Sequence, residues 1–314
     1  MQKQLPLVII VLALAAQAEA QRPAAKEITA AHPVSSFHLE NSLLWEISGK
    51  GLSRPSYLFG TMHLLCADDA KLSDSLRYCI ESVGQVYFEI DMDDMKETFS
   101  ALQYLNMNNN TRLPDLLTPA EYARVKEYFK TNKVMLPLSM LERMKPYFIT
   151  ALISENKFPC EAKDGMEQVI MKEVKKDHKP IYGLETVQFQ ASVFDSIPYQ
   201  RQAKDLVKMI DSSGKGEDSS DLQLMEMYRR QELNKMYEMT ADEEGMSDFI
   251  DLLLYNRNAN WVHKMPAIMT SKSTLFAVGA GHLGGEKGVI SLLRQAGYSV
   301  RPLKHRPGLE TLTN

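Results

Sequence analysis

The chain contains one short pattern twice, an apolar segment that ends in Gly-x-x-His. The first copy is Ser56-Tyr-Leu-Phe-Gly60-Thr-Met-His63, and the second is Ser273-Thr-Leu-Phe-Ala-Val-Gly279-Ala-Gly-His282. A glycine at the end of a strand permits a sharp turn and a close ligand approach, because it has no Cβ. The histidine then lies at the carboxyl end of the strand, where open α/β sheets bind ligands. Two matched copies therefore predict that both imidazoles meet at one site.

Each copy is followed by a helical pattern and then by a second strand-like segment, and such strand–helix–strand units favour parallel strands. A further apolar segment, 42–48, and the strand of the first copy, 55–60, flank Gly49-Lys50-Gly51 and predict a hairpin. We therefore expect an α/β fold with a central mixed β-sheet flanked by helices. The predicted strands are 42–48, 55–60, 85–90, 180–184, 274–279 and 298–303, and the helices of the two units are 68–83 and 286–296.

The region between the two units, about 92–271, reads mainly as a large helical insertion. Thr118-Pro119-Ala-Glu121 has the N-cap, first-turn proline and capping-box glutamate that open a helix. Most methionines fall in this region, and packing between helices explains them more simply than an adaptable groove for peptides or lipids. The polar segment 211–221 predicts a loop. We expect one domain over 37–310.

The N-terminus predicts export. Lys3, the apolar stretch 5–16 and Ala18-Glu19-Ala20 have the order of a secretory signal peptide over 1–20, with an uncleaved anchor as the alternative. Residues 21–36 read as a linker. No later segment has the ~18 apolar residues of a membrane span. We expect a periplasmic or extracellular protein with no transmembrane anchor after signal removal.

The charge balance and the cysteines constrain possible partners. A net charge of -4 and a pI near 6.0 indicate no excess of basic residues, so we expect no nucleic-acid partner. Cys66, Cys79 and Cys160 allow one disulfide and one free thiol in an oxidising compartment, and the pairing stays open. Cys66 lies three residues after His63 and could instead bind a metal, although a disulfide or a buried thiol is more common.

His63, His282 and Glu89 form the leading candidate site. Glu89 lies in the apolar segment Val86-Tyr-Phe-Glu-Ile90, where a buried carboxylate needs a cation, a metal or hydrogen bonds; the alternative is a strand end that points to solvent. Two imidazoles and a carboxylate could hold a divalent cation that activates water. In a metal-free version, one histidine acts as general base and a separate cation stabilises the oxyanion.

Arg257 is the candidate for that separate cation. It follows the apolar helical run 249–254, so a helix could aim it at the sheet; the alternative is a surface arginine lying over Trp261. The segment from Gly279 to Gly285 resembles a dinucleotide-binding loop but lacks the later acidic residue that such a loop requires. The remaining histidines are predicted to lie on the surface: His32, His38, His178, His263 and His305.

Taken together, these segments resemble the TraB/GumN family, whose animal members are the Tiki proteins. The resemblance covers roughly 42–303 and depends on the order of LLWEISG, SYLFGTMH, VYFEIDM, KPIYGLETVQFQ, YNRNANWV and FAVGAGHLGGEKG. It implies a central sheet with a helical insertion between the two Gly-x-x-His units. It also implies metallopeptidase activity on a peptide or protein substrate.

The resemblance also implies roles for individual residues. The metal ligands would be His63, Glu89 and His282, with manganese, cobalt, zinc or iron as candidate ions. Arg257 would stabilise negative charge and Asn258 would position it, while Glu185 would give hydrogen-bond support. The wider kinship with erythromycin-esterase-like and haem-binding ChaN-like proteins leaves two alternatives, a metal-independent esterase-like hydrolase and a haem- or ligand-binding protein without turnover. In the latter, His63 or His282 would be an axial ligand.

Overall fold

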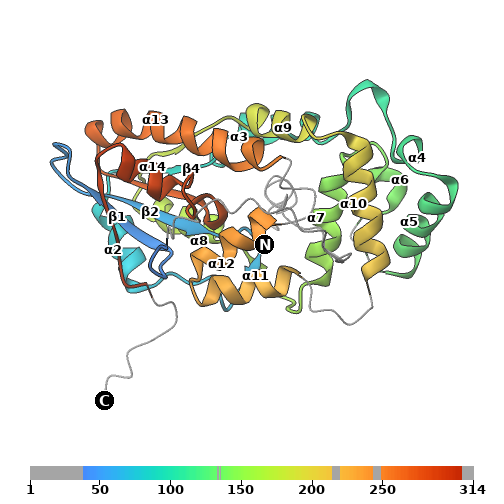
Figure 1. Ribbon diagram of the computed structural model, residues 1–314, viewed down its shortest axis with the longest axis horizontal. Helices are drawn as coiled ribbons and strands as arrows, with labels where there is room; N and C mark the ends of the chain where they lie inside the picture. Colours follow the sequence, from blue (N-terminus) through green and yellow to red (C-terminus); the bar gives the residue numbers. More distant parts are fainter. Residues whose placement is uncertain (1–37, 133, 135, 214–219, 243–248, 306–314) are drawn as a thin grey trace, which may run out of the picture.

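A computed structural model describes residues 38–132, 134, 136–213, 220–242 and 249–305 (Figure 1). The expected signal peptide and linker, 1–36, lie outside these residues. The described chain has the expected α/β architecture, with a six-stranded mixed sheet in the order β6-β4-β7-β2-β1-β8. The strands of this sheet are β1 (Leu44–Ser48), β2 (Ser56–Thr61), β4 (Gln85–Phe88), β6 (Ile181–Gly183), β7 (Thr274–Gly279) and β8 (Ser299–Pro302).

The two Gly-x-x-His strands are neighbours in this sheet. β7 pairs in parallel with β2 on one side and with β4 on the other, with Gly60 opposite Val278 and Phe88 opposite Ala277. The carboxyl ends of β2, β4 and β7 therefore meet at one edge. The predicted hairpin is confirmed, because β1 pairs antiparallel to β2 with Leu44 opposite Phe59. β8 adds to the far side of β1 and completes the sheet.

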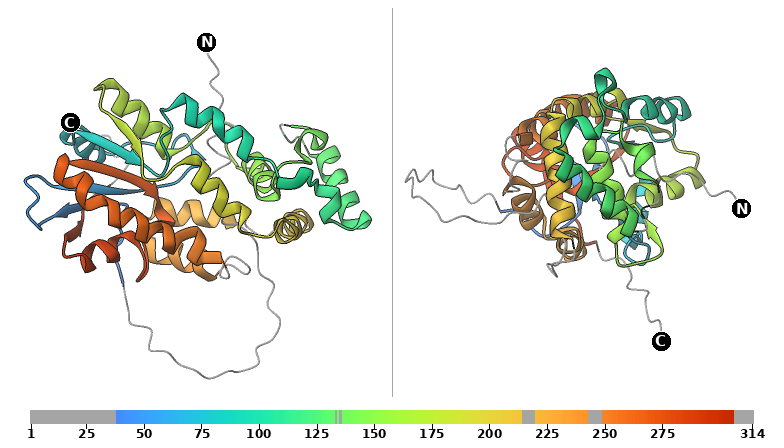
Figure 2. Two further views of the ribbon diagram at one scale, coloured as in Figure 1. Left: turned by 90° about the horizontal axis from the view of Figure 1, so that it is seen from above. Right: turned by 90° about the vertical axis from the view of Figure 1, so that its right-hand side faces the viewer.

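Helices cover the sheet and form a second, helical part (Figures 1 and 2). The views show α13 and α14 beside the sheet and α4, α5, α7 and α10 gathered at the opposite end of the molecule. The helices are α2 (Asp74–Ser82), α3 (Met95–Tyr104), α4 (Leu113–Leu116), α5 (Pro119–Thr131), α6 (Leu138–Leu141), α7 (Pro146–Lys157), α8 (Met166–Lys176), α9 (Val187–Asp195), α10 (Tyr199–Ser212), α11 (Ser220–Arg229), α12 (Leu233–Asp242), α13 (Asn256–Ser271) and α14 (Val289–Gln295). Short helical turns are η1 (Asn108–Asn110), η3 (Asp251–Tyr255) and η4 (Ala280–His282).

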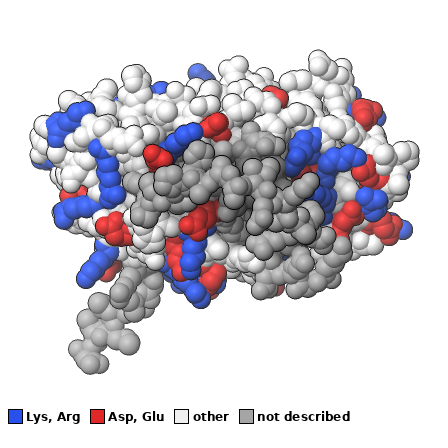
Figure 3. Space-filling model, in the orientation of Figure 1, with Lys and Arg blue, Asp and Glu red and all other residues white. Residues whose placement is uncertain are grey.

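Each part has its own hydrophobic core. The sheet core includes Trp45, Phe59 and Phe276, all of which are buried, and the helical core includes Phe148 and Phe194. Burial of large apolar side chains is the main stabilising contribution in both parts. Acidic and basic side chains are mixed over the described surface on the face that Figure 3 shows. Among the described helices, none is long and apolar enough to cross a membrane.

Local capping explains where several elements begin. The helix predicted from residue 68 starts at Asp74, because the side chain of Ser73 accepts the backbone N–H of Leu76 and caps it. The capping box of Thr118 and Glu121 opens α5 as predicted. The predicted loop over 211–221 overlaps the ends of α10 and α11, and 214–219 lie outside the described residues.

The structure corrects the prediction for one histidine and assigns the cysteines. His305 is buried rather than a surface residue: it packs edge-on against Phe59, and its Nδ1 lies 2.6 Å from Oγ of Ser73. Cys66 and Cys160 form a disulfide, so Cys66 is not a metal ligand here, and Cys79 is a free, buried thiol. The disulfide adjoins a small antiparallel ladder between β3 (Leu65–Cys66) and β5 (Lys163–Asp164).

Candidate functional site

Three of the predicted site residues surround one glycine at the end of β7. A Cβ placed on Gly279 would lie 3.1 Å from Glu89 Oε1, 3.6 Å from His282 Cδ2 and 3.8 Å from His63 Nε2. The turns after β2 and β7 bring the two histidines to this point, and Glu89 follows β4 directly. The structure thus brings together His63, His282 and Glu89, and glycine is the residue that leaves room for all three.

Glu89 is buried and fully hydrogen-bonded, so its strand end does not point to solvent. Its carboxylate accepts the Gly279 backbone N–H at 2.8 Å, Gln190 Nε2 at 3.0 Å and Arg257 Nη2 at 2.6 Å. Burial alone would raise the pKa of Glu89, but the positive charge of Arg257, helped by His282, lowers it to about 2. Glu89 is therefore a carboxylate at neutral pH.

Arg257 is a buried cation between two carboxylates. It lies in the first turn of α13, and its guanidinium donates to Glu89 and, through Nε and Nη2, to Glu185 at 3.0 and 2.7 Å. The guanidinium carbon lies 4.8 Å from the centre of the Trp261 ring, whose Nε1 also donates to Glu185. The surface alternative for Arg257 is therefore wrong. Burial raises the pKa of Glu185 despite this arginine.

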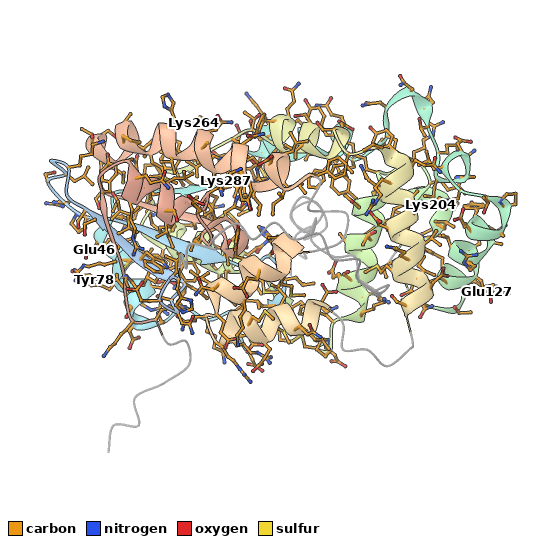
Figure 4. All side chains as sticks on the ribbon, viewed as in Figure 1. Glu46, Tyr78, Glu127, Lys204, Lys264 and Lys287 are labelled. Atoms are coloured by element: carbon orange, nitrogen blue, oxygen red, sulfur yellow. A yellow bond between two sulfur atoms is a disulfide. The ribbon has the colours of Figure 1, made fainter. Side chains whose placement is uncertain are left out.

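His282 is held between Asn258 and Arg257. The amide of Asn258 donates through Nδ2 to the backbone oxygen of Lys287, so its Oδ1 faces Nδ1 of His282 at 2.6 Å (Lys287 is labelled in Figure 4). This arrangement assigns the ring hydrogen to Nδ1 and leaves a lone pair on Nε2, which lies 3.1 Å from Arg257 Nη1. Burial and Arg257 lower the pKa of His282 to about 3. Asn258 thus contacts His282 rather than positioning Arg257.

His63 has a different partner. Its Nδ1 lies 2.8 Å from Oε1 of Glu167 in the first turn of α8, and 22% of its side chain is exposed. Burial acts to lower the pKa of His63, but the carboxylate of Glu167 outweighs this effect and the pKa is raised. His63 and His282 therefore have Nδ1 engaged and Nε2 on the side of Glu89 and Gly279.

Two residues of this site escaped sequence reasoning. Glu167 lies within Gly165-Met-Glu-Gln168, and its burial and its contact with His63 appear only in the folded chain. Gln190 lies in the segment Glu185–Gln190, and its amide bridges the carboxylates of Glu89 and Glu185. Nothing local to Gln190 distinguishes it from a surface glutamine.

The donor set fits a divalent metal by its chemistry. Two imidazole nitrogens and a carboxylate suit manganese, cobalt, zinc or iron, and metal-binding histidines commonly have the second ring nitrogen held by an acceptor. Arg257, however, contacts both Glu89 and Nε2 of His282. Throughout the part of the chain that the structure describes, no three His, Cys, Asp or Glu side chains have the spacing of a metal centre. The spacing is that of an Arg–Glu–His hydrogen-bond network.

Comparisons with known proteins identify relatives of this chain. The sequence model of the TraB/PrgY/gumN family matches residues 43–302. The chain is 25% identical to the Metalloprotease TIKI homolog of Amphimedon queenslandica over 88% of its length and 64% of that protein. It is 24% identical to Metalloprotease TIKI1 of Danio rerio, over 85% of this chain and 65% of that one, and 23% identical to Metalloprotease TIKI1 of Homo sapiens, over 85% and 62%.

The chain thus spans slightly less than two thirds of the length of these curated relatives. The matched part includes the sheet, the helical insertion and every residue of the candidate site. No solved structure matches the chain.

Proposed function

Because the chain belongs to the TraB/PrgY/gumN family, we propose that it is an exported, Tiki-like hydrolase that cleaves peptide bonds with the help of a divalent metal. The observation that carries this proposal is the convergence of His63, Glu89 and His282 around Gly279, with Nε2 of both rings on the same side. The names of the relatives support the reaction class.

The protonation states favour this chemistry near neutral pH. With a pKa of about 3, His282 is neutral and its Nε2 carries a lone pair, which Arg257 Nη1 faces at 3.1 Å, while Glu89 is ionised. His63, Glu89 and His282 would hold the metal. When bound, the metal would supply polarisation of the scissile carbonyl and activation of water.

Arg257 would stabilise the negative charge that develops on the scissile carbonyl oxygen. Its N–H groups are already engaged by Glu185, Glu89, the Leu253 backbone oxygen and the His282 ring. It would therefore act through its fixed positive charge and not by donating a hydrogen bond to that oxygen. His63 is the only one of the two histidines with a raised pKa and with 22% of its side chain exposed. His63 is therefore the more accessible of the two rings.

Two features support an exported protein. The N-terminal residues 1–20 have the order of a signal peptide. The disulfide between Cys66 and Cys160 is of a kind that persists in oxidising compartments such as the periplasm or the extracellular space. Export places the site among peptide and protein substrates outside the cytoplasm.

The test uses the mature chain from residue 21. Metal-free protein is titrated with manganese, cobalt, zinc or iron, and the loaded protein is assayed on a peptide library. We expect stoichiometric binding and cleavage, both lost in His63→Ala, His282→Ala and Glu89→Gln. His263→Ala, an exposed histidine on α13, is the matched control and should behave as the wild type. Wild-type activity in any two of the three site variants would reject the proposal.

A metal-independent hydrolase is the second candidate, and one observation favours it. Arg257 already supplies a positive charge at Glu89 and His282, where the metal would otherwise act. In this case His63 would be the general base, and Arg257 the electrostatic stabiliser of the oxyanion. Peptide or ester cleavage that survives exhaustive chelation, yet is lost in His63→Ala, would select this candidate. Activity that disappears on chelation and returns with added metal would reject it.

A further inference from the structure

We propose that Glu167 is a positioning residue that holds the ring of His63 with its hydrogen on Nδ1, so that Nε2 faces Glu89 and Gly279. The contact joins Nδ1 of His63 and Oε1 of Glu167 at 2.8 Å. Its consequence for turnover rests on the proposed function, but the state of the His63 ring can be measured without any activity.

Glu167 has no other evident reason to be buried. Only 5% of its side chain is exposed, and among the described residues neither carboxylate oxygen meets the full geometry of a hydrogen bond, while Oε1 lies 2.8 Å from the His63 ring. A buried carboxylate with so few partners destabilises a fold relative to an apolar side chain of similar size. A residue of this kind is therefore best explained by what it does to its one partner.

The backbone around this pair is built to keep it in place. Gly165 is the N-cap of α8, and a Cβ on it would lie 2.5 Å from the backbone oxygen of His63. The backbone N–H of Met166 donates to the oxygen of Met62 at 3.0 Å. The start of α8 thus packs directly against the Gly-x-x-His turn after β2, and Glu167 reaches His63 from a fixed position.

The two imidazoles have matching supports. Asn258 accepts from Nδ1 of His282, and Glu167 occupies the same position at His63. Acceptors at the second ring nitrogen fix the orientation and tautomer of histidines that act through the other nitrogen. The two rings are therefore held alike, one by an amide oxygen and the other by a carboxyl oxygen.

The test reads the His63 ring directly. Mature, metal-free protein labelled with ¹⁵N-histidine is studied by NMR, and the His63 signals are identified by their loss in His63→Ala. At a pH high enough for the His63 ring to be neutral, we expect its one proton on Nδ1 and none on Nε2 in the wild type. In Glu167→Met the hydrogen should move to Nε2 or exchange between both nitrogens. Glu173→Met, in which a glutamate on the same helix is replaced, should keep the wild-type pattern.

Stability and metal affinity separate positioning from a structural role. We expect Glu167→Met to melt at the wild-type temperature or above, while affinity for zinc falls about 10–100-fold. If Glu167→Met does not fold, Glu167→Asp withdraws the carboxylate by one methylene and should also disturb the Nδ1 pattern. An unchanged His63 spectrum in the folded variant overturns the inference. An altered spectrum in a protein whose wild type hydrolyses nothing keeps the role of Glu167 and rejects the proposed function instead.

Discussion

Oδ1 of Asn258 lies 2.6 Å from Nδ1 of His282, and this contact connects the first turn of α13 to the turn that follows β7. The two residues are 24 positions apart in the chain. Because the Asn258 amide is also fixed by the backbone oxygen of Lys287, it presents an acceptor and not a donor to the ring. A helix in the insertion thereby decides which nitrogen of His282 is available to the site.

Removing this acceptor should impair the site more than the fold. In Asn258→Ala the ring of His282 can rotate and change tautomer, so we expect turnover to fall about 10–100-fold. Peptide cleavage by the metal-loaded protein measures the effect. Asn260→Ala, an exposed asparagine on the same helix, is the control and should keep wild-type turnover. Equal turnover in the two variants would contradict this role of Asn258.

Replacement of Arg257 should destabilise the protein strongly. Arg257→Met leaves the buried carboxylates of Glu89 and Glu185 without their cation, and breaking a buried pair on one side lowers the free energy of unfolding by about 3–5 kcal/mol. Urea denaturation measures this change. Arg230→Met removes an exposed arginine whose pairing with Glu226 is screened by water, so its free energy of unfolding should stay close to that of the wild type. A similar loss of unfolding free energy in both variants would show that the Arg257 network is not coupled to folding.

Burial of His305 should make stability fall in mild acid. Burial lowers the pKa of His305 from 6.5 to about 4, so the unfolded chain binds a proton there at a higher pH than the folded chain. The contribution of the neutral, buried His305 to the free energy of unfolding is complete above pH 6.5 and is lost as the pH falls towards 4. One such group accounts for about 2 kcal/mol between neutral pH and about pH 5.

The variant His305→Gln isolates this contribution. Other titrating groups act equally in both proteins, so the wild type should lose about 2 kcal/mol more than the variant between the same two pH values. Urea denaturation at each pH gives the four free energies. Parallel pH dependence in the two proteins would mean that His305 is charged or solvated in the folded state.

Reduction of the Cys66–Cys160 disulfide should lower both stability and activity. The bond closes a loop with a sequence separation of 94, for which the unfolded chain loses entropy equivalent to about 4.7 kcal/mol. It also ties β3, just after His63, to the segment that leads into α8. Thermal unfolding and turnover are compared with and without a reductant, and the double variant Cys66→Ala/Cys160→Ala should no longer respond. A wild-type melting temperature that a reductant leaves unchanged would exclude a stabilising disulfide.

Strand patterns and glycine positions made much of the fold predictable. The segment 274–279 is β7 as predicted, and the hairpin of β1 and β2 follows its glycine turn. The ends of the helices were harder to predict, because a single capping side chain, such as Ser73 at α2, decides where a helix begins. The order of strands was not predictable, because the pairing of β7 with both β2 and β4 is a contact between distant segments whose local patterns are alike.

The site residues that belong to a sequence motif could be predicted. Those that only tertiary contacts identify could not. The recognisable sequence motifs contain four of the site residues: His63, Glu89, Arg257 and His282. Glu167 is identified only by what packs against it, and the same holds for Gln190. His305 was wrongly placed on the surface, because its position near the tail says nothing of the pocket that Ser73 and Phe59 form around it. The cysteine pairing likewise needed the β3–β5 ladder.

The place of β7 in the sheet has a consequence for the time at which the site can form. β7 separates β2 from β4, and the hydrogen bond from the Thr274 backbone to the Ser56 side chain spans 218 residues. Contacts this distant form late and slowly in folding. A chain still being synthesised or translocated has no central strand, no Gly279 and no second histidine. The candidate site therefore cannot assemble until the chain has emerged as far as β7 and His282, close to the end of the described residues.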